Sequence, residues 1–317
     1  MRKQQWLLWA AALVTASGVW AGEGEPAPGA GDGSGEKKPA PPPIPLHTIE
    51  GVSGVFITPT AYFANLPEDG GIWGKPALAF SGVTMGEKNL LVSTLTTNVF
   101  GRLELGYSFM RLHLGDWAHD VRAATTLDTQ NHVNLHTLSA RYMLVREGEW
   151  DTAWVPAVTA GLSWKHNDSI MAIDRDLAGT CKAIGVRDDD GFDFTLTATK
   201  MITGVLPNAL ILSAGLRSTE AAQIGLLGFT RDRDIVFEGS AVYFLTNRLL
   251  LAAEYRQKPD NLKRIPGLVG NEDDWWTLAA AYIVNDRCTA ALGYGHFGTI
   301  LNHDENASWA LQLKWEF

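Results

Sequence analysis

Nine charged side chains stand at alternate positions of otherwise apolar segments, and they are the residues best suited to act on a solute. They are Arg102, Glu104, Arg141, Arg217, Glu238, Glu254, Arg256, Lys314 and Glu316. Charges of both signs that line a water-filled passage create a field that orients small polar solutes. The same side chains in a closed interior pair with one another and only stabilise the fold. The sequence leaves both interpretations open.

A catalytic site would need a nucleophile and a base within hydrogen-bond reach, ordinarily with a third group that orients the base. His136 and Ser139 are three residues apart, so on an extended strand they point to opposite faces. His296, His303 and Asp304 surround one loop without a recognisable spacing. We therefore predict that the protein is not an enzyme and rank a lipid-modifying activity as the third hypothesis.

Two acidic runs, at residues 188–190 and 272–274, could attract hard cations. Calcium takes at least about six oxygen ligands, and neither run has the ligand spacing of a dedicated loop. We interpret both runs as solvated turns and predict neither a metal nor a cofactor. The net charge is −9, and the sequence contains no block of basic residues. A nucleic-acid partner therefore has no electrostatic footprint and is excluded.

The dominant period of the chain is two residues, which is the period of a β-strand. It is clearest at the C-terminus, where Trp309, Leu311, Leu313, Trp315 and Phe317 alternate with mostly polar residues. Similar segments recur along the chain, at residues 76–85, 89–98, 102–109, 132–146, 154–165, 192–199, 208–218, 234–245, 248–256, 276–282, 287–296 and 309–317. Their lengths suit tilted transmembrane strands. The pattern predicts about twelve strands, with ten or fourteen as alternatives.

The segments are joined alternately by tight turns and by long polar loops, which is the layout of an outer-membrane barrel. Aromatic residues such as Tyr107, Trp164 and Trp276 stand near strand ends. The alternative is a soluble β-sandwich or lipocalin-like barrel, in which the apolar face would line a core. A soluble core would not ordinarily contain Glu254 and Arg256 together with the other charges. We therefore predict a transmembrane antiparallel β-barrel over residues 76–317.

Three segments precede this barrel. Residues 1–21 combine two basic residues, a short apolar run and the end Val19-Trp20-Ala21, which indicates a cleaved secretory signal rather than a membrane anchor. Residues 22–46 are rich in Pro and Gly and predict a disordered tether. Residues 47–75 either fill the barrel lumen as a plug or form a periplasmic piece.

The two cysteines are expected to be unpaired. Export would place Cys181 and Cys288 in a compartment that permits a disulfide. However, Cys181 falls in a polar loop and Cys288 on the lipid-facing side of a strand, so we favour two free thiols.

Several stretches resemble a bacterial family of unknown function numbered three-zero-three-four. They are LILSAGLRSTEAAQIGLLGFTRDRD from Leu210, AEYRQKPDNL from Ala253 and GFDFTLTATK from Gly191. The resemblance extends over most of the chain and implies an outer-membrane barrel without an assigned activity. The string GVSGVFITPTA from Gly51 is also similar to the opening of barrel proteins associated with exopolysaccharide export.

The leading functional hypothesis is a passive outer-membrane channel for small polar solutes. The second is a closed structural or interaction barrel that docks a secretion or polysaccharide-export partner. In either case the expected partners are outer-membrane lipid with lipopolysaccharide, and the barrel-assembly machinery that inserts such proteins.

Overall fold

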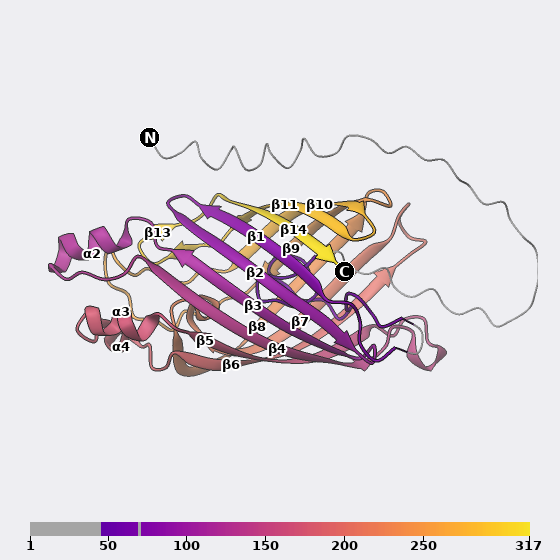
Figure 1. Ribbon diagram of the computed structural model, residues 1–317, viewed down its shortest axis with the longest axis horizontal. Helices are drawn as coiled ribbons and strands as arrows, with labels where there is room; N and C mark the ends of the chain where they lie inside the picture. The colour runs from indigo at the N-terminus through magenta and orange to yellow at the C-terminus, as the bar shows by residue number, and fades with distance from the viewer. Residues whose placement is uncertain (1–45, 69–70) are drawn as a thin grey trace, which may run out of the picture. The chain divides into compact units, whose positions relative to one another are not determined.

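The computed structural model describes residues 46–68 and 71–317. The predicted signal segment, and all but the last residue of the predicted tether, lie outside the described residues. Helices and strands are labelled in Figure 1. Within the described residues, no helix has the length and apolarity needed to cross a membrane.

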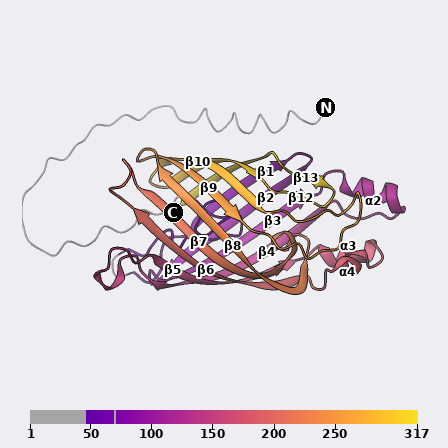
Figure 2. The same cartoon turned by 180° about the vertical axis from the view of Figure 1, so that it is seen from behind.

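Twelve antiparallel strands form a closed barrel. They are β1 (Ala77–Met85), β2 (Lys88–Val99), β3 (Leu103–His113), β4 (His132–Val145), β5 (Ala157–Asn167), β6 (Asp190–Ile202), β7 (Leu210–Ala221), β8 (Phe229–Phe244), β9 (Leu249–Arg256), β10 (Trp275–Asn285), β11 (Cys288–His296) and β14 (Ser308–Glu316). Each strand pairs with its sequence neighbours, and β14 closes the barrel by pairing with β1 from Met85↔Ser308 to Ala77↔Glu316. The predicted strand number and antiparallel arrangement are confirmed. Figures 1 and 2 show the barrel from two opposite sides.

The apolar face of each strand points outward. On β14 the side chains of Trp309 and Leu311 are 51% and 47% exposed, whereas Gln312 and Lys314, on the other face of the same strand, are buried. A water-soluble barrel would have the opposite arrangement, because burying charge while exposing Leu and Trp to water raises the free energy. Hydrocarbon around the barrel removes that cost, so the structure is a membrane-spanning barrel of the outer-membrane type.

The two ends of the barrel differ. The loop end holds α2 (Trp117–Thr125), α3 (Ile170–Asp176), α4 (Thr180–Ile184), the 3₁₀ turn η2 (Ala222–Gly225) and the short pair β12 (Thr299–Ile300) and β13 (His303–Asp304). The opposite end, called the turn end here, carries shorter connections, one with η1 (Glu149–Asp151), and the C-terminus. Figure 1 shows the three helices together at one end and the C-terminus toward the other.

The loop end is covered by an apolar layer rather than by solvated loops. Trp117 of α2, Ile173 of α3 and Leu262 are buried there around a cavity of about 70 Å³. Cys181 also lies in this layer, so its predicted place in a polar loop was wrong, because the loop folds into a helix with a buried face. Cys181 and Cys288 are both free thiols.

A charge on the outer face should destabilise the barrel only where lipid contacts it. Leu311→Arg, at a mid-strand position paired with Leu292, is expected to lower the free energy of unfolding by about 2–4 kcal/mol. Ala123→Arg, on the exposed side of α2, should leave it nearly unchanged. Urea unfolding of protein refolded into phospholipid vesicles measures both. Equal stability of Leu311→Arg and wild type would contradict the lipid-facing assignment.

Candidate functional site

The described N-terminal segment lies inside the barrel. Every residue from 46 to 64, the segment called the plug here, is buried. Its contacts reach strands that are well separated around the wall. The two ring nitrogens of His47 lie 3.1 Å and 2.8 Å from the hydroxyls of Thr94 and Thr96 on β2. The backbone N–H of Ala61 donates to Thr199 Oγ1 on β6 at 2.7 Å.

Two glycines let the plug approach the wall closely. Gly51 has φ +79°, a conformation that favours glycine, and its N–H donates to Thr48 O at 3.0 Å to close a tight turn. Gly106 on β3 faces this turn, and a Cβ atom at Gly106 would lie 2.0 Å from Gly51 O. The wall therefore has space for the plug only because this position lacks a side chain.

Glu50 is the centre of the strongest plug-to-wall contact. Its carboxylate lies 2.5 Å from Lys165 Nζ on β5 and 2.6 Å from Arg256 Nη2 on β9. Arg217 Nη2 on β7 lies 3.2 Å away. Burial by itself would raise the pKa of Glu50, but the charges of Arg217, Arg256 and Lys165 hold this pKa well below its usual range. Glu50 is therefore ionised at neutral pH.

The three cations around Glu50 are also held by two wall carboxylates. Asp193 on β6 binds Lys165 at 2.7 Å and Arg217 at 2.9 Å. Glu238 on β8 binds Arg217 and Arg256, each at 3.1 Å. Together with Glu50, the network contains three positive and three negative groups and is neutral only when the plug is in place. Breaking a buried pair on one side leaves an uncompensated charge, which is strongly destabilising.

Elsewhere the wall supplies the carboxylates and the plug supplies the donors. Glu254 on β9 accepts hydrogen bonds from the backbone N–H groups of Phe56, Ile57 and Thr58 at 3.1, 2.9 and 2.8 Å. This arrangement resembles an anion held by successive backbone amides. It satisfies buried N–H groups that have no strand partner.

A further wall pair binds the middle of the plug. Glu104 on β3 accepts from the N–H of Ser53 at 3.1 Å and from the Ser53 hydroxyl. Arg141 on β4 pairs with Glu104 at 3.2 Å and donates to the carbonyls of Ser53 and Thr60. The plug is thus fixed through both its donors and its acceptors.

The structure brings most of the nine predicted charges into this site. Glu104, Arg141, Arg217, Glu238, Glu254 and Arg256 are buried and surround the plug. Lys314 is buried as well and pairs with Glu316 at 2.6 Å. Glu316 and Arg102 lie at the turn end, where both are part-exposed and Arg102 is 3.8 Å from Glu149.

Sequence reasoning missed three members of the network, Glu50, Lys165 and Asp193. Lys165 and Asp193 occupy the polar face of their strands by the same alternation that identified the others. That alternation was therefore a sufficient signal for both. Glu50 stands in a segment without strand periodicity, so no alternation of polar and apolar residues marks it as part of the site.

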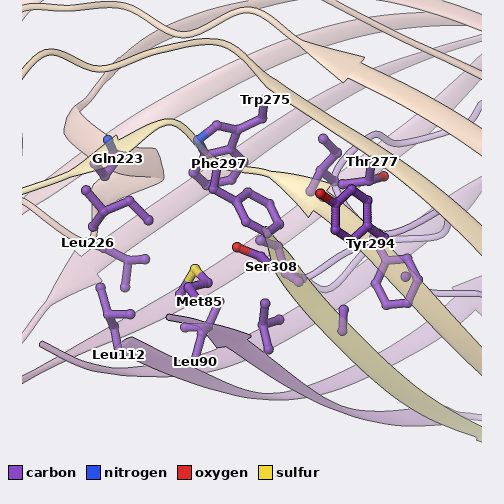
Figure 3. Close-up of a pocket in the computed structure, with 18 residues that line it drawn as sticks. Met85, Leu90, Leu112, Gln223, Leu226, Trp275, Thr277, Tyr294, Phe297 and Ser308 are labelled. Carbon is purple, nitrogen blue, oxygen red and sulfur yellow. The ribbon is translucent and has the colours of Figure 1, made fainter. Parts of the chain in front are cut away.

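Between the plug and the loop end the lumen becomes apolar (Figure 3). Phe56 and Ile57 of the plug, Leu112 of β3 and Trp275 of β10 line a cavity of about 30 Å³ there, about the volume of one water molecule in the liquid. η2 folds inward beside it, and the carbonyl of Ile224 accepts from Lys165 Nζ at 3.1 Å. The charged network thus lies between the plug and an inward-folded loop.

The chain belongs to the family described as "Protein of unknown function (DUF3034)", whose model matches residues 45–314. The family expected from the sequence is thereby confirmed. No curated protein matches this chain.

Solved structures of similar fold include membrane porins and a transporter. The KdgM porin is 8% identical over 76% of this chain and 99% of its own, with a TM-score of 0.46. The NanC porin is 7% identical over 76% of this chain and 98% of its own, with a TM-score of 0.46. The P. putida toluene transporter TodX is 11% identical over 78% of this chain and 80% of its own, with a TM-score of 0.42. Similarities of this size carry no argument about solute or activity.

Removing one cation from the network should lower the free energy of unfolding far more than removing an exposed cation. Lys165→Met leaves two buried carboxylates, Glu50 and Asp193, short of a partner, and should lower the free energy of unfolding by about 3–5 kcal/mol. The matched control is Lys75→Met, because Lys75 pairs with Glu68 in solvent and should contribute little. Urea unfolding in vesicles measures both variants. Equal effects would show that the network is not the main anchor.

Proposed function

We propose that the protein is a plugged outer-membrane channel, exported through its N-terminal signal, that passes small polar solutes when the plug leaves the lumen. The observation that carries the proposal is the plug itself. It contacts strands around the wall, including β2, β9 and β14, and all of these contacts are non-covalent. Many of them are to charged groups. Water and solute ions can replace such contacts, so plug displacement exposes a polar wall with charges of both signs.

The route of displacement follows from how the plug is attached. The described residues between the plug and β1, 65–68 and 71–76, lie at the turn end, where Gly74 N donates to Asn98 O and Phe100 N to Ile72 O, both at 2.7 Å. The apolar layer and η2 cover the opposite end. A plug that moves toward the turn end therefore does not need to cross the apolar layer, although conduction also requires that layer to open. Phe56 and Ile57 of the plug pack beside Leu226 on the inner side of this end, so withdrawal of the plug removes apolar contacts that hold it closed.

The second candidate function is the closed structural or interaction barrel. The pairing of the buried charges within the plug network favours it, because a fully paired interior also stabilises a barrel that never opens. Conductance separates the two candidates. Catalysis forms no part of either proposal.

A substitution that occupies the space of the plug should open the channel. A side chain at Gly106 would overlap Gly51 O, so Gly106→Val is expected to displace the plug and to produce steady conductance in a planar bilayer. Gly293→Val tests a second part of the wall, on β11, because its Cβ would lie 3.0 Å from Phe56 Cε2. Wild type should remain closed.

The matched control is Gly82→Val, whose Cβ would meet only Leu91 Cδ2 at 3.9 Å on the outer face of β1. It should be as closed as wild type. Heat-modifiable migration in gels establishes that each variant is folded. Folded Gly106→Val and Gly293→Val proteins without conductance would favour the closed structural barrel.

A further inference from the structure

The wall around Glu50 has the composition of an anion site. Lys165, Arg217 and Arg256 contribute three positive charges, and Asp193 and Glu238 contribute two negative charges, all from barrel strands. The wall alone therefore carries one net positive charge at this level. Glu50 supplies the compensating charge from the plug.

The contacts to Glu50 recognise a carboxylate group and not merely a negative charge. Lys165 Nζ and Arg217 Nη1 donate to Oε1 at 2.5 and 3.4 Å. Arg256 Nη2 lies 2.6 Å, and Arg217 Nη2 3.2 Å, from Oε2. A guanidinium that reaches both oxygens matches the planar geometry of a carboxylate.

The site also has binding capacity that Glu50 does not use. Among the residues that the structure describes, Arg256 Nη1 and the acceptor Asp193 Oδ1 are both buried without a hydrogen-bond partner. A buried guanidinium N–H without an acceptor is costly. A solute with further oxygen atoms beside its carboxylate could satisfy this donor, whereas the single side chain of Glu50 does not.

We propose that Glu50 is an internal ligand that occupies a binding site for the carboxylate group of a small organic acid. Such a solute competes with the plug for Lys165, Arg217 and Arg256. This inference rests on the proposed function for its consequence, because competition at this site favours the open channel and selects organic anions as the solute. The site itself is a property of the folded wall and can be tested without conductance.

The test is chemical rescue with acetate as the probe. Glu50→Ala vacates the site and leaves the wall charges uncompensated, so this variant should refold poorly in chloride. Acetate at the same ionic strength should restore folding and stabilise the variant, shifting its unfolding equilibrium by about tenfold when acetate is present at ten times its Kd. Wild type, whose site is filled, should not respond.

Glu50→Gln is the matched control. Its amide is neutral, so it loses charge as the alanine variant does, but it fills the same space. Acetate should therefore not rescue it. The measurements are refolded fraction and urea unfolding in vesicles. Rescue of Glu50→Ala but not Glu50→Gln supports the site, and equal responses to acetate and chloride in Glu50→Ala would overturn it.

A second measurement uses the opened channel. Gly106→Val should pass acetate in preference to potassium, and adding Lys165→Gln should reduce that preference, as read from reversal potentials. Rescue without any conductance in Gly106→Val would remove the channel proposal and retain the carboxylate site. Conductance without rescue and without anion preference would retain the channel and remove the site.

Discussion

The ion network around Glu50 is the constraint on which the interior of the barrel depends. It places six charged groups in a volume from which the plug and η2 exclude solvent, where an unpaired charge is far more costly than at a surface. Because three charges are positive and two of the three negative ones belong to the wall, neutrality requires the plug. The position of a segment with little regular structure is therefore determined by wall charges on strands β5 to β9.

The same network links the membrane-facing surface to the lumen. Strand alternation gives each barrel strand an apolar outer face and a polar inner face, and hydrocarbon stabilises the former. The inner polar groups then need partners, since their strand backbones are already paired. Glu254 meets this need with three plug amides, Glu104 with Ser53 and Arg141, and the cation cluster with Glu50. The plug therefore both fills the lumen and supplies the partners that the inner polar groups of the wall need.

The barrel was predictable from the sequence because its signal is local and repeated. The period-two pattern at residues 309–317 is typical of all twelve strands, and it also placed residues such as Arg217 on the inner face. The plug was open to two interpretations, because residues 47–75 have no periodicity and their partners are distant in the sequence, from 47 residues for His47 and Thr94 to 115 for Glu50 and Lys165. The apolar layer at the loop end was missed for a related reason, since short helices such as α4 are stabilised by tertiary packing rather than by their own sequence.

Hydrogen exchange measures directly whether the plug is held inside the barrel. If residues 46–64 are held in the lumen by the wall charges, a peptide covering Phe56 to Thr58 should exchange as slowly as the barrel strands in membrane-inserted protein. Glu254→Gln should accelerate its exchange without affecting β14. Exchange of this peptide at the rate of an exposed turn, in protein whose strands are protected, would show that the plug does not occupy the lumen.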